Sequence, residues 1–211
     1  IASHGFNHQH ITKQTQKAFA LDITDAKSLL EDLTAAPVNG YRAPCFSITA
    51  DNEWAHDEIY NAGYLYSSST YPIVHDLYGV PNAPRTPYFL ENGLLEIPVS
   101  TAKYRNKIVP AGGGGYFRLL PYFLFNSILK KSKNQLDYIN FYTHPWEYDP
   151  KQPKIKSNAK SNFRHRVNQH GALAKLTKLC QVYQFDTLAN VHLEKSYPTL
   201  GKWTDIASGK F

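Results

Sequence analysis

Short apolar runs alternate with amphipathic stretches along this chain, and this alternation constrains its fold more than any other feature. Such alternation is typical of β/α architectures, in which strands and helices follow one another. A first helix is expected from a cap at Thr24 to a stop before Pro37. Its apolar face would consist of Ala26, Leu29, Leu30 and Leu33.

A second helix is expected after a cap at Thr49 or Asp51, with Gly63 as the left-handed residue beyond its end. The apolar residues of this helix are Trp54, Ala55 and Ile59. Strands are expected over residues 64–66 and 94–97. Residues 72–98 are rich in proline and aromatic residues, which indicates a long loop before the second of these strands.

The later part of the chain begins with a glycine run at residues 112–115. The run lacks the Gly-Lys-Ser/Thr ending of a phosphate loop, so a flexible or tightly turning surface loop is expected. A helix over residues 119–131 should bury Leu120, Phe123, Leu124 and Ile128. The remaining expected elements are a buried strand over 138–142, an exposed basic stretch over 151–162 and a helix over 172–183 that carries Leu173, Leu176, Leu179 and Cys180.

The composition suits one globular domain, or one domain with a small appendage. The 211 residues are 42% hydrophobic and 19% charged, which excludes disordered, coiled-coil and collagen-like chains. No apolar run approaches the roughly 20 residues that span a bilayer. The chain starts at Ile1 and contains no Met, so we expect a segment upstream of Ile1.

The formal net charge of +6 could favour an acidic polymer as partner. Basic residues concentrate in two groups: Lys151, Lys154, Lys156, Lys160, Arg164 and Arg166, and Lys103, Arg105 and Lys107. A solvated basic face is favoured over a nucleic-acid site, because no nucleic-acid motif accompanies these groups. Cys45 and Cys180 lack a metal-ligand spacing and suit two buried thiols as well as one disulfide.

Three stretches of the sequence contain residues that could bind a metal or take part in catalysis. His4 and His8 are spaced so that one helical turn would bring both imidazoles to a single divalent ion, although such pairs also occur on polar surfaces without metal. In the second stretch, Pro44 lacks an N–H, so the amide of Cys45 is the next donor that could face an oxyanion. The alternative is a strand-end turn with a surface arginine, Arg42.

The third stretch places His144 directly after the buried strand expected over 138–142. In β/α barrels this end of a strand carries the catalytic groups. Imidazole can exchange protons near neutral pH, so His144 could be an acid or base, or a loop histidine.

Taken in this order, the three stretches resemble the polysaccharide deacetylases with the nodulation-protein-B homology domain, of the carbohydrate esterase family 4 type. The resemblance implies His4 and His8 as metal ligands, with Gly5 where Ser or Thr is usual. It implies that Arg42 orients a catalytic aspartate, that the Cys45 amide holds the oxyanion and that His144 is the general acid. It also implies that Tyr142 lines the acetyl pocket.

Longer strings are similar to a subgroup found with bacterial exopolysaccharide and exosortase (PEP-CTERM) loci. These strings begin at Gly40, at Pro110 and at His144. The resemblance implies a distorted (β/α) barrel that lacks its first strand and first Asp-containing motif. It also implies a catalytic domain over residues 1–190, with a subgroup-specific part from about 150, and a C-terminal tail over 191–211.

The chain departs from this family at two points. It has no Thr-Phe-Asp-Asp-Gly motif, which supplies a third metal ligand and the general base, and Ser67 replaces an aspartate of the subgroup. A metal held by His4 and His8 alone would be incompletely coordinated.

The activity implied is metal-dependent hydrolysis of N-acetyl groups on an amino-sugar polysaccharide, with zinc as the metal and cobalt or nickel as alternatives. Aromatic residues expected to contact the sugar are Tyr41, Tyr116, Tyr142 and Trp146. The alternative is a catalytically incompetent relative that binds polysaccharide. No nucleic-acid partner and no membrane segment are expected, and both the bacterial cytoplasm and the cell envelope stay open as locations.

Overall fold

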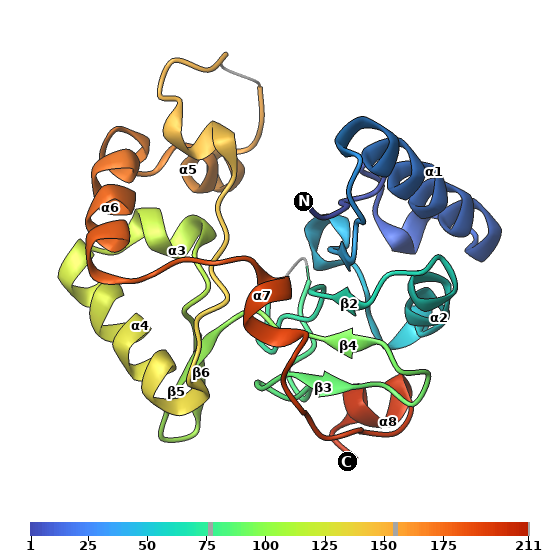
Figure 1. The fold of residues 1–211 in the computed structure, drawn as a ribbon. Helices are drawn as coiled ribbons and strands as arrows, with labels where there is room; N and C mark the ends of the chain where they lie inside the picture. Colours follow the sequence, from blue (N-terminus) through green and yellow to red (C-terminus); the bar gives the residue numbers. More distant parts are fainter. Residues whose placement is uncertain (76–77, 154–155, 211) are drawn as a thin grey trace. The chain divides into compact units, whose positions relative to one another are not determined.

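The structure is a computed structural model that describes residues 1–75, 78–153 and 156–210. The chain divides into two compact units (Figure 1). Unit 1 comprises residues 1–99 and 187–211, and unit 2 comprises residues 100–186. Lys154, one of the basic residues noted in the sequence, lies outside the described residues.

Unit 1 contains a small mixed sheet with the strand order β1-β2-β4-β3. Its strands are β1 (Gly40–Tyr41), β2 (Tyr66–Ser67), β3 (Tyr88–Phe89) and β4 (Leu95–Glu96). The first three in this order run parallel, and β3 is antiparallel to β4. Isolated bridges from Ser3 to Tyr41 and from Phe89 to Thr199 extend the sheet.

The first helix of unit 1 is longer than the sequence pattern predicts. Helix α1 (Gln16–Thr34) begins after Thr15, whose hydroxyl accepts a hydrogen bond from Ala18 N. The expected cap at Thr24 is wrong, because the Thr24 hydroxyl bonds to Ala20 O inside the helix. The apolar residues Phe19 and Ile23 extend the buried face upstream, which explains the earlier start.

The second helix follows its expectation closely. Thr49 caps the short helix η3 (Ala50–Asn52), and α2 (Trp54–Asn61) follows it. Gly63 adopts the expected left-handed conformation with φ of +81°. Other short helices of unit 1 are η1 (Ile11–Lys13), η2 (Pro44–Phe46), α7 (Leu188–His192) and α8 (Trp203–Ser208).

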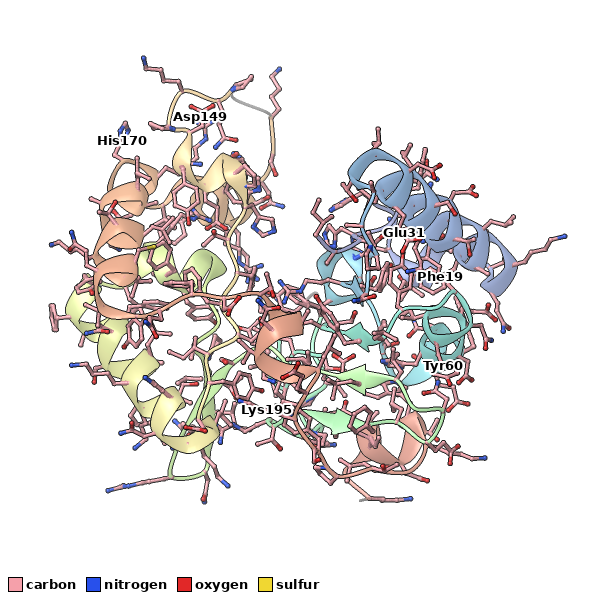
Figure 2. All side chains as sticks on the ribbon, viewed as in Figure 1. Phe19, Glu31, Tyr60, Asp149, His170 and Lys195 are labelled. Atoms are coloured by element: carbon pink, nitrogen blue, oxygen red, sulfur yellow. The ribbon has the colours of Figure 1, made fainter. Side chains whose placement is uncertain are left out.

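The core of unit 1 joins α1, the sheet and the end of the chain. Phe19, which Figure 2 labels, packs edge-on against Tyr41 and Trp54. Trp203 and Ile206 of α8 are buried in the same core. The segment expected as a C-terminal tail therefore contributes to this core, and the predicted boundary of the catalytic domain stays a prediction.

Unit 2 consists of a two-stranded β-hairpin and several helices. Strands β5 (Thr101–Tyr104) and β6 (Lys107–Pro110) pair antiparallel. The helices are α3 (Gly114–Leu119), α4 (Tyr122–Leu136), η4 (Pro145–Tyr148), α5 (Ala159–Arg166) and α6 (Gln169–Val182). Phe117, Phe125 and Leu129 are central to the core of this unit.

Several expectations for unit 2 are wrong. The expected helix over 119–131 is broken at Pro121, and the following helix buries Phe125 and Leu129, while Phe123 is 70% exposed. Leu124 is also exposed. Proline fixes the start of the new helix. The stripe of this helix that faces the core contains Phe125 and Leu129, and Phe123 and Leu124 lie outside it.

Residues 138–142 form no strand and make one isolated bridge, between Gly113 and Tyr142. Helix α6 matches the helix expected over 172–183 and buries Leu179, but Leu173 is exposed. Cys45 and Cys180 are free thiols and both are exposed, so neither the disulfide nor the buried thiols are present.

The fold class is mixed α/β, as expected from the alternation of apolar and amphipathic stretches. Within residues 1–75, 78–153 and 156–210, the strands form a four-stranded sheet and a hairpin, and no closed barrel is found. No helix among the described residues combines the length and hydropathy needed to cross a bilayer.

Candidate functional site

The loop between His4 and His8 in unit 1 is a bend, not the helical turn expected from the spacing. The buried carboxylate of Asp22 shapes this bend. Its Oδ2 accepts a hydrogen bond from Phe6 N at 2.9 Å, and its Oδ1 accepts from Asn7 N at 2.9 Å. Helix α1 therefore fixes the loop that carries both histidines.

Gly5 is required by this bend. Its φ is +79°, and a Cβ at this position would lie 2.8 Å from Asp22 Oδ2. A side chain would face both a strained backbone and a steric conflict. The bend therefore favours glycine at position 5.

The bend brings the two imidazoles together. The ring centroids of His4 and His8 lie 4.9 Å apart, with the planes at 67°. His4 Nδ1 lies 2.7 Å from Arg42 O, and a carbonyl oxygen can only accept, so Nδ1 carries the proton in this bond. The lone pair of His4 is then on Nε2, which is the arrangement typical of metal-ligating histidines.

The donor set is nevertheless incomplete for a metal. Zinc takes about four ligands, of which at least three come from the protein in catalytic sites. No group of three or more His, Cys, Asp or Glu side chains that could hold a metal occurs in the part of the chain that the structure describes. His4 and His8 could thus supply two ligands and no more.

Arg42, the arginine of the second stretch, is held by Ser68. Its Nε donates to Ser68 O at 2.9 Å and its Nη2 to Ser68 Oγ at 2.8 Å. The Arg42 carbonyl oxygen also accepts the hydrogen bond from His4 Nδ1. The first and second sequence stretches are therefore in direct contact within unit 1. Arg42 is half-buried and held by Ser68, whereas the alternative interpretation expects a surface arginine in a strand-end turn.

The turn after Arg42 has a strained backbone. Cys45 and Phe46 both adopt left-handed conformations, with φ of 54° and 51°. Such residues cost of order 1 kcal/mol each and often occur at functional sites. The turn bonds run from Phe46 N to Ala43 O and from Ser47 N to Pro44 O, so neither uses the Cys45 N–H. Desolvation raises the pKa of the Cys45 thiol, which argues against a thiolate nucleophile.

A buried carboxylate that the sequence analysis missed supports this turn. Glu96 Oε1 accepts hydrogen bonds from Ser69 N at 2.8 Å and Thr70 N at 2.7 Å. Ser69 Oγ in turn accepts from Ala43 N at 2.9 Å. Glu96 also lies opposite Ser67 in the β2–β4 register.

The charge of Glu96 is stabilised inside the protein. Burial by itself raises the pKa of this carboxyl, but attraction to His56 and hydrogen bonds from Ser67 and Thr70 outweigh it and hold the pKa below its usual range. His56 Nε2 lies 3.7 Å from Glu96 Oε2, which is within ion-pair reach. The sequence signal for Glu96 was its position in an apolar strand, where an unpaired acid would be costly.

In unit 2, His144 is oriented by another missed carboxylate, Glu147. His144 Nδ1 lies 2.8 Å from Glu147 Oε1, and the same oxygen accepts from His144 N at 2.9 Å. The Glu147 side chain is buried, whereas that of His144 is 49% exposed. The spacing of three residues between a capping residue and a glutamate was the sequence signal for this contact.

Arg118 completes this arrangement from α3. Its Nε donates to Glu147 Oε2 at 2.6 Å, and the remaining guanidinium nitrogens donate to the carbonyls of Arg164, His165 and Val167. Burial raises the pKa of Glu147, but hydrogen bonds from His144 and Arg118 outweigh burial and lower the pKa below its usual range. Glu147 is therefore an ionised carboxylate that fixes the His144 ring.

The glycine run at residues 112–115 packs against the segment just before His144. Residues 112–114 are buried, so the expected surface loop is wrong. A Cβ on Gly113 would collide with Tyr142 O, and Gly113 has φ of +111°. The run lets the backbone approach residue 142, whose N–H donates to Gly112 O at 2.7 Å.

The aromatic residues expected at the site differ in their surroundings. Tyr142 packs edge-on against His144 with the ring centroids 5.8 Å apart, and Trp146 stacks on His144 at 5.5 Å. Tyr116 is partly exposed on α3. Tyr41 is 2% exposed in the unit 1 core, so it offers no face to a sugar and its expected role is wrong.

The structure thus groups the expected residues by unit. His4, His8, Arg42 and Cys45 belong to unit 1, and Tyr116, Tyr142, His144 and Trp146 belong to unit 2. Glu96 in unit 1 and the pair Arg118 and Glu147 in unit 2 are additional buried charges that hold these groups.

Comparisons with known proteins add a family. No match was found among curated proteins. Among solved structures, a crystal structure described as that of a "putative polysaccharide deacetylase" from Mycobacterium smegmatis aligns with 99% of this chain at 14% sequence identity and a TM-score of 0.42. The chain spans 61% of the length of that protein chain. A family model described as "Domain of unknown function (DUF3473)" matches residues 68–193. Because this match covers more than half of the chain, the protein belongs to the DUF3473 family.

Proposed function

We propose that this chain is part of a metal-dependent deacetylase that hydrolyses N-acetyl groups of an amino-sugar polysaccharide, on a barrel of the polysaccharide deacetylase type. Bacterial exopolysaccharide biosynthesis is the proposed context, as the resemblance to the exosortase-locus subgroup implies. The observation that carries the proposal is the hydrogen bond of 2.7 Å between His4 Nδ1 and Arg42 O. It joins two motifs that lie 38 residues apart in the sequence and places the proton of the His4 ring on Nδ1.

The roles of the unit 1 residues follow from their geometry. A divalent metal, when bound at His4 and His8, would supply a Lewis acid for the acetyl carbonyl and an attacking water. The Cys45 N–H would donate to the developing oxyanion, and the strained turn would hold that donor in place before the reaction. Arg42, which is fixed by Ser68, would hold the turn and the histidine pair in constant positions relative to each other.

His144 would protonate the departing amine. Its Nδ1 is held by Glu147 Oε1, so the proton would be transferred from Nε2. An amine leaves poorly as an anion, and proton donation at this step makes the C–N bond cleavage feasible. The products would be acetate and an amino sugar with a free amine.

A second candidate function is polysaccharide binding without catalysis. It is favoured by the lack, among the described residues, of a third side chain that would complete a metal site with His4 and His8. The chain also contains no Thr-Phe-Asp-Asp-Gly motif to supply the base.

Acetate release decides between the two. The full-length protein would be assayed on N-acetylated oligosaccharides with zinc, cobalt, nickel or chelator, beside a double variant His4→Ala and His8→Ala and a single variant His144→Asn. Deacetylation predicts metal-dependent release that falls at least about 100-fold in both variants, the order expected for loss of a general acid or a metal.

The matched control is His170→Ala, which removes an exposed histidine of unit 2 outside the candidate site (Figure 2). It should release acetate at the parent rate. Unchanged release in the double variant would overturn the metal proposal. No release by the parent protein under any metal, together with retained binding, would favour the binding function.

A further inference from the structure

The charge of the chain is divided unequally between its two units. The sequence of unit 2 contains 15 Lys and Arg residues and four Asp and Glu residues, a formal net charge of +11. Unit 1 contains eight basic and 13 acidic residues, a formal net charge of −5. The overall charge of +6 therefore hides a strongly basic unit of 87 residues.

Part of this positive charge lies on α5 and on the residues that directly precede this helix in the sequence. Lys151, Lys156, Lys160 and Arg164 are all exposed, and Arg166 is half-buried. The sequence between residues 148 and 166 contains one acidic residue, Asp149. Asp149 is exposed and is labelled in Figure 2. Phe163, on the same helix, is 58% exposed, so an apolar ring stands among the basic side chains.

Helix α5 is fastened directly to the His144 arrangement. The buried Arg118 donates to the carbonyls of Arg164, His165 and Val167 at the end of α5, and also to Glu147, which holds His144. The side chains make a second connection, because Trp146 stacks on His165 at 4.2 Å and on His144 at 5.5 Å. Within unit 2, Arg118 and Trp146 thus connect the basic helix to the candidate acid.

From this juxtaposition we infer that unit 2 binds a polyanion along α5, and that the substrate is an N-acetylated polysaccharide that also carries carboxylates, as uronate-containing polymers do. The substrate part of this inference rests on the proposed deacetylase function. Exposed Lys and Arg side chains would attract the carboxylates, and Phe163 would pack against a sugar face. A neutral polymer such as chitin would gain nothing from this charge.

A polysaccharide is favoured over a nucleic acid by the aromatic content of the face. Single-stranded nucleic acids are bound by several aromatic side chains on which successive bases stack. Here Trp146 is already packed against His144, His165 and Arg118, which leaves Phe163 as the exposed aromatic residue of α5.

The test compares two oligosaccharides of equal length by calorimetry at several salt concentrations, with the full-length protein. Hyaluronan oligosaccharide alternates glucuronate with N-acetylglucosamine, and chitin oligosaccharide carries N-acetylglucosamine alone. We expect tighter binding of hyaluronan, with an affinity that falls as salt screens the charges.

The binding face is tested by a triple variant, Lys156→Gln, Lys160→Gln and Arg164→Gln. Its matched control is Lys103→Gln, Arg105→Gln and Lys107→Gln, which removes the same charge from exposed positions on the β5–β6 hairpin. The α5 variant should bind hyaluronan about tenfold more weakly and with less salt dependence, as expected for three exposed ion pairs. The hairpin variant should change the affinity much less, and thermal unfolding checks that both variants fold.

Three results would overturn the inference: equal affinity for hyaluronan and chitin oligosaccharides, equal losses in the two triple variants, or binding of single-stranded DNA at least as tight as that of hyaluronan. Failure of the deacetylase proposal gives a different pattern. In that case the α5-dependent binding of hyaluronan is present, but no acetate is released from any N-acetylated oligosaccharide with any metal.

Discussion

At the scale of single residues, the candidate site depends on buried charges that each hold a functional group in place. Glu147 lies between the exposed His144 and the buried Arg118, and Glu96 holds the backbone behind the strained turn at Cys45. A buried charge of this kind is costly alone and is tolerated because several hydrogen bonds satisfy it. Removing one partner should therefore affect more than the bond that is lost.

We expect Glu147→Gln to lower the free energy of unfolding by about 3 kcal/mol, because it leaves the Arg118 guanidinium buried without its counter-charge. It should also release the His144 ring. Urea denaturation measures the first effect. Asp149→Asn, an exposed change two residues away, is the control and should alter stability by less than about 0.5 kcal/mol. A loss in Glu147→Gln no larger than in the control would contradict the role of the buried pair.

Gly5→Ser would restore the residue type that is usual in the resembled family, yet we expect it to destabilise the protein by about 1 to 2 kcal/mol. The positive φ and the approach of the new Cβ to Asp22 Oδ2 both oppose the change. Denaturant titration measures it. Gly115→Ser is the matched control, since nothing lies within 4 Å of a Cβ there. Similar stability of the two variants would show that the bend does not require glycine.

Acid pH should weaken both units through their buried glutamates. The pKa values of Glu96 and Glu147 are lower in the folded protein than the ordinary value of 4.5. Their contribution to stability is complete above that ordinary value and is lost as pH falls through the lower folded values. Unfolding free energies at about pH 6 and about pH 3 measure the loss. Glu147→Gln should show a smaller loss, and an equal loss would contradict this assignment.

At the scale of secondary-structure elements, local signals set some helix ends and tertiary packing set the others. The signals at Thr49 and Gly63 act within a few residues, and they mark the start of η3 directly before α2 and the left-handed residue after α2. Thr24 carries an equally good capping side chain, but the apolar residues Phe19 and Ile23 upstream made a longer helix more stable. Capping chemistry by itself cannot decide between such alternatives.

The end of α1 offers a prediction at this scale. Ala35 follows the helix in a left-handed conformation with φ of 49°, which glycine adopts without strain. We expect Ala35→Gly to stabilise the protein by about 0.5 to 1 kcal/mol. The same change at the exposed Ala174 inside α6 should destabilise it by about 1 kcal/mol. Thermal and urea unfolding measure both, and changes of the same sign would contradict the assigned end of α1.

At the scale of the whole molecule, the opposite charges of the two units have a consequence for stability. Unit 2 carries +11 in 87 residues and should be weakened by repulsion among its own basic side chains. Salt screens such repulsion over distances beyond about 10 Å at 0.1 M ionic strength. We expect added sodium chloride to protect amides of α4 and α6 from hydrogen exchange more than amides of α1.

The Lys103→Gln, Arg105→Gln and Lys107→Gln variant provides the control for this prediction. With less charge to screen, its unit 2 amides should gain less protection from salt than those of the parent protein. Equal gains in the two proteins, or equal gains in the two units, would contradict a role for self-repulsion.

The sequence by itself determined the mixed α/β class and the second helix, with the cap at Thr49 before it and the left-handed Gly63 after it. These rest on interactions between residues a few positions apart, which the sequence displays directly. The residue types around His4, Arg42 and His144 also make these stretches candidates for catalysis and metal binding, and this assignment stays a prediction.

Only the tertiary structure decided which charges hold those stretches and which helix faces are buried. Glu96 and Arg118 find their partners about 26 to 49 residues away, and the buried stripe of α4 depends on what packs against it. The expected strand over 138–142 failed for the same reason, since an apolar run becomes a strand only where a neighbouring strand pairs with it. The free energy of such contacts comes from burial and pairing across the fold, which local sequence does not encode.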